Sequence, residues 1–345
     1  MTPTHYMILC GGKGQRLWPL SRSNTPKQLV SVDDKQTLLE TTVERLAQIK
    51  KNTDKIGIVT NKEYFQAIQQ LLGDIVDTYT IEPCGKNTAP AMLYACLQIA
   101  EEENTDPVVV FTPSDHSIKE TFLFEKTLTS VISYAESYGD ICLIGVKPSK
   151  ASSLYGYILA NNKDEINSPI NIDKFIEKPP QEIAELLWNT SYTLWNCGIF
   201  VARNSIFLQA FKEAAPELYQ DMISVVQGHK EYAQISPCSF DTTVTEKIAN
   251  RVVFASNMTW QDLGDIESFV SYSQDKNSKK EQNCISLNGE GNIAHSKKKL
   301  IAFVDVSNLC VIETDEIILV KKVGEQENIR ELIKKLEDKG FQNFL

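Results

Sequence analysis

Short apolar runs alternate with segments of helical periodicity through the first two-thirds of the chain. The run 6–10 (YMILC) is continuously apolar, and the segment 38–49 returns Leu39, Val43 and Leu46 to one helical face. Further apolar runs, each separated from the next by a helical pattern, lie at 55–60, 78–82, 107–113 and 141–146. Such alternation is typical of a parallel sheet that is covered on both faces.

The pattern changes near residue 152, where short β-like runs carry polar insertions. The segment 273–283 (SQDKNSKKEQN) has no large apolar residue and is predicted to be a linker. Beyond it follow short β-like pieces and a helical tail. We therefore predict an α/β fold with a Rossmann-like, mostly parallel sheet and helices on both faces over 1–273. A small β-rich module with a terminal helix is expected over 284–345.

Charge and composition restrict the function classes. The 345 residues include 35 basic and 45 acidic side chains, and a net charge of −10 disfavours nucleic-acid and membrane-surface binding. No apolar run approaches the roughly 18 residues of a spanning helix, and the N-terminus lacks the features of a signal peptide. The eight cysteines contain no Cys-x-x-Cys pair, which is typical of buried, reduced thiols. We expect a soluble cytoplasmic protein with no nucleic-acid or membrane partner.

The stretch 11–28 (GGKGQRLWPLSRSNTPKQ) directly follows the first apolar run and contains no acidic residue. Glycines let backbone N–H groups converge on an anion, and basic side chains add positive charge. A glycine-rich turn with solvated charges is the alternative. The stretch contains three glycines and four basic residues, with one further lysine behind it: Gly11, Gly12, Gly14, Lys13, Arg16, Arg22, Lys27 and then Lys35. We interpret it as a site for a small anionic ligand.

Two common phosphate motifs do not fit this stretch. A P-loop needs Ser or Thr after its lysine, and here Gly14 follows Lys13. A dinucleotide fingerprint needs a third glycine where Leu17 stands, although Asp33 and Asp34 lie about 20 residues on. A nicotinamide oxidoreductase is therefore a weak alternative.

Carboxylates follow a predicted strand and recur in a later turn. Asp115 and His116 end the run TPSDH, and Asp262 and Asp265 lie in WQDLGD. One or two carboxylates plus substrate phosphates is the usual ligand set of Mg²⁺, so Asp115 with Asp262 would suffice if the fold brings them together. A helix cap or a loop carboxylate is the alternative for Asp115.

Two further motifs have ordinary structural explanations as well as functional ones. In FIEKP, Glu177 and Lys178 fit an exposed ion pair at a strand end. In EPCGKNTAP, Glu82, Gly85 and Asn87 precede a helix, and Asn87 suits a helix cap.

Seven motifs occur together and in one order: LCGGKGQRLWPLSRSNTPKQ, EPCGKNTAPA, TPSDH, YGYI, FIEKP, WNCGIF and WQDLGD. In that order they resemble the mannose-1-phosphate guanylyltransferases (GDP-mannose pyrophosphorylases), within the sugar nucleotidyltransferases. The first two motifs are specific for that family, whereas YGYI and EKP belong to the wider superfamily. The resemblance covers essentially the whole chain, including the short C-terminal module, for which it implies a β-helix-like form.

The resemblance implies a transferase that converts GTP and mannose 1-phosphate into GDP-mannose and pyrophosphate, with Mg²⁺ or another divalent cation as cofactor. A homodimer is one candidate assembly. The implied site residues fall into four groups: catalytic Arg16, Lys27, Asp115, Lys178 and Asp262; nucleotide-binding Leu9, Gly11, Gly12, Gly14, Glu82, Gly85, Asn87 and Ser114; sugar-phosphate-binding Gly156, Glu177, Lys178 and Asn196; metal-binding Asp115 and Asp262.

Three alternatives accompany this hypothesis. The first is a nucleotidyltransferase for a different sugar 1-phosphate. The second is a catalytically silent regulatory homologue, which the presence of the acidic pair and of Arg16 and Lys27 disfavours. The third is a bifunctional enzyme with phosphomannose isomerase activity, which we do not expect because the residues after 283 are too few for a second catalytic domain.

Overall fold

The computed structural model describes residues 2–345 except 13, 23–24, 32–35, 161–165, 191, 277–283, 297 and 325–327; for 274–276 it describes the backbone alone. The chain forms two compact units. Unit 1 comprises residues 1–11, 43–114 and 118–260, and unit 2 comprises residues 12–42, 115–117 and 261–345. Lys13, Lys35 and the pair Asp33–Asp34, which the sequence singled out, lie outside the described residues.

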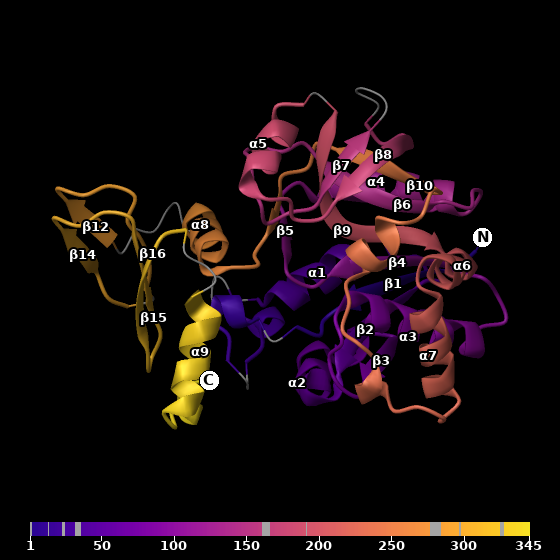
Figure 1. Ribbon diagram of the computed structural model, residues 1–345, viewed down its shortest axis with the longest axis horizontal. Helices are drawn as coiled ribbons and strands as arrows, with labels where there is room; N and C mark the ends of the chain where they lie inside the picture. Colours follow the sequence, from indigo (N-terminus) through magenta and orange to yellow (C-terminus); the bar gives the residue numbers. More distant parts are fainter. Residues whose placement is uncertain are drawn as a thin grey trace. The chain divides into compact units, whose positions relative to one another are not determined.

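Unit 1 contains a nine-stranded sheet in the order β3-β2-β1-β4-β9-β6-β10-β8-β7 (Figure 1). Its strands are β1 (Thr4–Leu9), β2 (Lys55–Asn61), β3 (Thr78–Glu82), β4 (Val108–Pro113), β6 (Ile141–Val146), β7 (Tyr157–Ala160), β8 (Ile170–Ile176), β9 (Thr193–Arg203) and β10 (Arg251–Ser256). The strands β8 and β9 run antiparallel to their neighbours, and the remaining strands of the described sheet share one direction. The predicted α/β fold class is confirmed, and the sheet is mixed because these two strands oppose the rest.

Helices cover both faces of this sheet. Alternate residues of a strand point to opposite faces, and both sets are buried along β1 and β4. Met7 and Phe111 pack in one core with α3 and α6, whereas Ile8 and Val110 are buried on the other face, and α4 packs on β6, β9 and β10. The helices are α1 (Leu38–Ala47, which spans the boundary between the units), α2 (Lys62–Leu72), α3 (Thr88–Glu102), α4 (Thr121–Ala135), α5 (Gln181–Trp188), α6 (Asn204–Ala214) and α7 (Pro216–Val226).

Unit 2 combines the loop after β1 with the C-terminal part of the chain. Its elements include the 3₁₀ turns Gln15–Leu17 and Lys27–Leu29, α8 (Ile266–Lys276), β12 (Cys284–Leu287), β13 (Ile293–His295), β14 (Ile301–Val304), β15 (Leu309–Glu313), β16 (Ile318–Lys322) and α9 (Asn328–Asp338). The short strand β5 (His116–Ile118) pairs with β11 (Trp260–Asp262) where the chain passes between the units.

The C-terminal strands form successive coils. β12 pairs with β14 and β13 with β15, both in parallel. In both ladders the partners lie 17 residues apart along the chain, as in Cys284 with Ile301 and Ile293 with Cys310. Such a fixed offset between parallel strands is the pattern of a β-helix, which confirms the form that the family resemblance implies. Apolar side chains of α8, α9 and β15 pack around Trp18 in a separate small core.

The predicted linker differs from the structure at its start. Residues 273–276 continue α8 as far as Lys276, because Phe269, Val270 and Tyr272 anchor this helix in the cores of unit 2. Residues 277–283 lie outside the described part of the chain.

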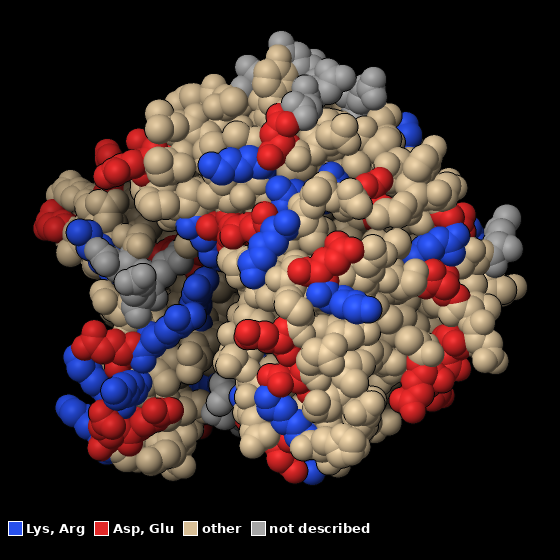
Figure 2. Space-filling model, turned by 45° about the vertical axis from the view of Figure 1, so that its right-hand side comes forward, with Lys and Arg blue, Asp and Glu red and all other residues tan. Residues whose placement is uncertain are grey.

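Acidic and basic side chains are interspersed over the face shown in Figure 2. The ten excess negative charges therefore do not gather there into one large acidic patch. Among the described residues, no helix is both long and apolar enough to cross a bilayer.

Candidate functional site

The carboxyl ends of β1, β3 and β4 bring one group of the predicted nucleotide residues together in unit 1. Leu9 pairs with Pro113, so that Ser114 follows at the same edge of the sheet. A Cβ on Gly11 would lie 3.3 Å from Oε2 of Glu82, and a Cβ on Gly85 would lie 3.5 Å from the Gly11 carbonyl oxygen. Parallel sheets bind ligands at this edge.

Glu82 is almost completely buried, at 2% exposure. Its carboxylate accepts hydrogen bonds from the Tyr232 hydroxyl and from the backbone N–H of Lys86. Burial raises the pKa of Glu82 to about 7, although both hydrogen bonds favour the charged form. The side chain therefore also has a structural role beneath the turn 82–87.

Glu82→Gln is expected to flatten the pH dependence of stability. Because the folded-state pKa is about 7 and the ordinary value 4.5, the unfolded chain releases the proton first. Wild-type stability should thus fall as pH rises between these values, by up to about 3 kcal/mol, and stay level above them. Glutamine keeps an acceptor for Tyr232 without titrating. Urea unfolding of both proteins at pH 5, 6, 7 and 8 checks this prediction. An equal change of the unfolding free energy with pH in the two proteins would contradict it.

Asn87 caps a helix, as the structural alternative for this motif predicted. Its Oδ1 accepts a hydrogen bond from the Thr88 N–H at 2.8 Å, and its φ is 73°. Asn87 and Gly85 are both exposed. A capping role does not occupy the amide N–H groups of Asn87, which stay available for a ligand.

The predicted sugar-phosphate residues Gly156, Glu177, Lys178 and Asn196 form a second group in unit 1, here called the sugar-phosphate wall. Lys178 pairs with Glu177, and the Asn196 N–H donates to the Gly156 carbonyl at 2.9 Å. A Cβ on Gly156 would lie only 2.5 Å from Oε2 of Glu177, so any side chain there would displace the carboxylate. The fold thus brings Gly156, Glu177, Lys178 and Asn196 together.

Asp241 also belongs to the sugar-phosphate wall, and the sequence does not predict it. It begins a π-helical turn, Asp241–Thr245, and its Oδ1 accepts from Nδ2 of Asn196 at 2.9 Å. Burial and then the neighbouring Glu177 carboxylate raise the pKa of Asp241 to about 7, although Lys178 and Asn196 lower it. Asp241 lies in none of the seven motifs. Its contact with Asn196 could not be predicted either, because the two residues are 45 positions apart along the chain.

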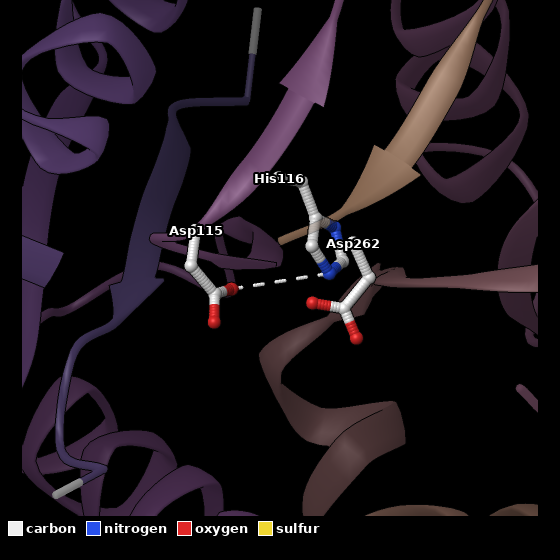
Figure 3. A group of neighbouring side chains, drawn as sticks. All are labelled: Asp115, His116 and Asp262. Carbon is white, nitrogen blue, oxygen red and sulfur yellow. Dashed lines mark ion pairs between the residues drawn. The ribbon is translucent and has the colours of Figure 1, made fainter. Parts of the chain in front are cut away.

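In unit 2 the two predicted metal ligands lie together. One ligand atom each from Asp115, His116 and Asp262 lies within 4.8 Å of the others, and Figure 3 shows these side chains converging. The Lys27 ammonium forms ion pairs with Asp115 and with Asp262, the latter at 3.5 Å. The fold therefore meets the condition that the sequence left open, and the two carboxylates already hold a positive charge.

The charges of this cluster stabilise one another. Burial alone would lower the pKa of Lys27, but Asp115 and Asp262 outweigh it and raise that pKa. Burial would raise the pKa of Asp115, but Lys27 and His116 outweigh it and lower that pKa. Asp115 is thus a carboxylate and Lys27 an ammonium ion at neutral pH.

The donor set fits Mg²⁺. Two carboxylates are hard oxygen donors, and Mg²⁺ takes its remaining ligands from water and substrate phosphates. The His116 ring nitrogen lies 3.9 Å from Oδ1 of Asp115 (dashed in Figure 3) and is a poorer Mg²⁺ ligand than an oxygen. Gly264 leaves room for the Asp262 carboxylate, since a Cβ at residue 264 would lie 3.0 Å from both of its oxygens.

Asp265 has a structural role. Its Oδ1 accepts from the Ser268 N–H at 2.8 Å, and the Ser268 hydroxyl donates to the Asp265 carbonyl at 2.8 Å. These bonds cap the start of α8.

The glycines of the opening loop differ in their surroundings. Gly14 has φ 64°, and a Cβ on it would overlap the Cβ of Lys27. Gly12 is exposed, and no described atom lies within 4 Å of a Cβ added to it. Arg16 follows in the 3₁₀ turn Gln15–Leu17 and forms no ion pair with any described residue. Gly14 is therefore required for the loop to pack on Lys27.

Gly14→Ala is expected to destabilise unit 2, and Gly12→Ala is the matched control. The left-handed backbone at Gly14 costs about 1–2 kcal/mol for alanine, and the overlap with Lys27 adds to this. A thermal melt should show a lower Tm for Gly14→Ala and an unchanged Tm for Gly12→Ala. Equal melting of both variants would contradict the packing of Gly14 on Lys27.

The nucleotidyl transferase family matches residues 5–279, and the family described as MannoseP isomerase/GMP-like beta-helix domain matches residues 282–336. The chain therefore belongs to the nucleotidyl transferase family. It is 27% identical to mannose-1-phosphate guanylyltransferase 2 of Escherichia coli O157:H7, over 97% of this chain and 74% of that protein. It is 30% identical to xanthan biosynthesis protein XanB of Xanthomonas campestris, over 97% and 73% respectively.

A solved structure shares the fold of nearly the whole chain. It is described as mannose-1-phosphate geranyltransferase from Thermus thermophilus, and it superimposes with a TM-score of 0.81 at 24% identity. The similarity covers 97% of this chain and 99% of that one. The likeness extends over both units, so the C-terminal β-helix is part of the shared fold.

Proposed function

We propose that this chain transfers GMP from GTP to mannose 1-phosphate, giving GDP-mannose and pyrophosphate. The observation that carries the proposal is the cluster in which Asp115 and Asp262 hold the Lys27 ammonium. A nucleotidyltransferase needs such a cluster for a cation and a triphosphate. The choice of GTP and mannose 1-phosphate is supported by the relatives named as mannose-1-phosphate guanylyltransferases.

The proposed reaction needs no general base. The second pKa of a phosphate monoester is about 6, so the sugar phosphate is mostly a dianion at pH 7. The barrier is the repulsion between anions and the cost of aligning them. Positive charge and positioning are therefore the main requirements of the site.

In unit 2, Lys27 and Arg16 would hold the triphosphate, and the backbone N–H groups of Gly12 and Gly14 would add donors. Asp115 and Asp262 would hold Mg²⁺, which when bound supplies positive charge at the α-phosphate oxygens. Lys27 is already fixed at the two carboxylates. Its charge is therefore in place before substrate arrives.

In unit 1, Lys178 would hold the phosphate of mannose 1-phosphate, and Glu177 would accept hydrogen bonds from sugar hydroxyls. Gly156 leaves the space that Glu177 occupies, and Asn196 completes the wall. Lys178 has a half-exposed side chain at the end of β8, so its ammonium is accessible to a ligand.

The nucleotide base would lie at the carboxyl ends of β1 and β3. Leu9, Gly11 and Ser114 line that edge, and the exposed Gly85 and Asn87 offer backbone and amide groups. Guanine presents N1–H and N2–H₂ as donors, which suit a carboxylate or carbonyl oxygens. Backbone carbonyl oxygens of the turn 82–87 would accept these bonds, and Glu82, whose carboxylate is buried beneath the turn, would support it.

A pyrophosphate-release assay with four nucleoside triphosphates and several hexose 1-phosphates tests this function. GTP with mannose 1-phosphate should give the highest kcat/KM. A tenfold preference for UTP or dTTP over GTP would contradict the guanylyltransferase assignment. A preference for another hexose 1-phosphate would assign the chain to a different sugar.

A further inference from the structure

One short segment of unit 1, residues 238–246, contacts the turn that bears the predicted nucleotide residues. The Cys238 N–H donates to the Lys86 carbonyl at 3.2 Å, and the Ala89 N–H donates to the Cys238 carbonyl at 3.1 Å. The Phe240 N–H donates to Oγ1 of Thr88 at 2.8 Å. The beginning of this segment is thus fixed on the start of α3.

The same segment also holds the sugar-phosphate wall. Oδ1 of Asp241 accepts from Nδ2 of Asn196 at 2.9 Å, and Oε1 of Glu246 accepts from the Glu177 N–H at 3.1 Å. Between these two carboxylates the backbone forms the π-helical turn Asp241–Thr245. π-Helical turns are rare and occur frequently at functional sites.

The amide of Asn196 is fixed at both of its ends. Its Oδ1 accepts from the Gly198 N–H at 3.0 Å, and its Nδ2 donates to Asp241. Only one amide orientation satisfies both bonds, because an exchange of oxygen and nitrogen would set two acceptors or two donors against each other. Without the Asp241 carboxylate the NH₂ group of Asn196 would lose this restraint.

We propose that Asp241 is a positioning residue of the sugar-phosphate site, which orients the amide of Asn196 toward the hydroxyls of the bound sugar. This inference rests on the proposed function. Asp241 lies beside Glu177, and the cation that acts on it, Lys178, is shared with that glutamate. An acidic side chain beside Glu177 suits the hydroxyl groups of a sugar better than an anionic phosphate, so Asp241 acts, through Asn196, on the sugar end of the substrate. Its raised pKa agrees with this dense acidic surrounding.

Steady-state kinetics of Asp241→Ala test the proposal. The KM for mannose 1-phosphate should rise about 10- to 100-fold, as for the loss of a hydrogen bond to a charged group, while the KM for GTP changes less than threefold. Asp241→Asn keeps an oxygen acceptor for Nδ2 of Asn196 and should recover most of the affinity. The matched control is Asp106→Ala. Asp106 lies just before β4, and its carboxylate accepts two hydrogen bonds from Ser205.

A double-mutant cycle with Asn196→Ala separates positioning from a purely structural role. If Asp241 acts through Asn196, the double variant should have nearly the same KM as Asn196→Ala alone. Additive increases, or equal losses for both substrates, would overturn the proposal. If Asp241→Ala does not fold, Asp241→Ser replaces it in the cycle with the same expected result.

The proposed function and this inference fail separately. If the wild-type protein transfers no nucleotide to any sugar 1-phosphate, the proposed function is wrong. If the wild type is active and Asp241→Ala behaves like Asp106→Ala, the function stands and the inference about Asp241 is wrong.

Discussion

Asp262→Asn is expected to lower kcat at least 100-fold while the protein stays folded. Asparagine has almost the same shape but removes one of the two charges that hold Lys27 and that would hold Mg²⁺. Loss of a main electrostatic stabiliser corresponds to about 3 kcal/mol in the activation free energy. The measurement is the rate of pyrophosphate release at saturating substrates over a range of Mg²⁺ concentrations.

The control for this variant is Asp315→Asn, which makes the same chemical change at an exposed position of unit 2. It should retain the wild-type rate. If Asp262→Asn reaches a near wild-type rate at saturating Mg²⁺, Asp262 is not a metal ligand.

Lys27→Ala and Lys178→Ala are expected to affect different substrates. Each change removes a charge-assisted contact of roughly 1.5–3 kcal/mol, so each variant should lose about 10- to 150-fold. Asp115 and Asp262 hold Lys27 at the proposed triphosphate site. Its loss should therefore chiefly weaken the binding of GTP and, in the reverse direction, of pyrophosphate. Lys178 is paired with Glu177 in the proposed sugar-phosphate site of unit 1. Its loss should therefore chiefly weaken the binding of mannose 1-phosphate.

Calorimetry of GTP binding separates the two variants, after circular dichroism has shown that both are folded. Lys178→Ala should bind GTP with nearly the wild-type affinity, and Lys27→Ala should bind it about 10- to 150-fold more weakly. If Lys178→Ala abolished GTP binding and spared mannose 1-phosphate, the two substrates would be assigned to the wrong lysines.

The sequence predicted the elements better than their order in the sheet. Continuous apolar runs identify β1, β4 and β6 because a strand buried on both faces must be apolar throughout. The position of β9 between β4 and β6 could not be read from such runs, because pairing depends on contacts between distant segments. The antiparallel β9 and β8 make the sheet mixed.

The same distinction holds for the site. Asp115 and Asp262 could be proposed as a pair from motifs and resemblance, but only the fold shows that both reach Lys27. The sequence predicts that Gly14 supplies a backbone donor, and the structure adds that residue 14 must be glycine to pack on Lys27. Asp241 was missed because its segment carries no motif, and its significance depends on one hydrogen bond to Asn196.

Isotope tracing with GTP labelled at either the α- or the γ-phosphate tests the central claim most directly. In the presence of mannose 1-phosphate and Mg²⁺, the α-label should appear in GDP-mannose and the γ-label in pyrophosphate, in equal amounts. Both products should fall together in Asp262→Asn. Transfer of the γ-label to the sugar, or release of pyrophosphate without α-labelled GDP-mannose, would contradict the account.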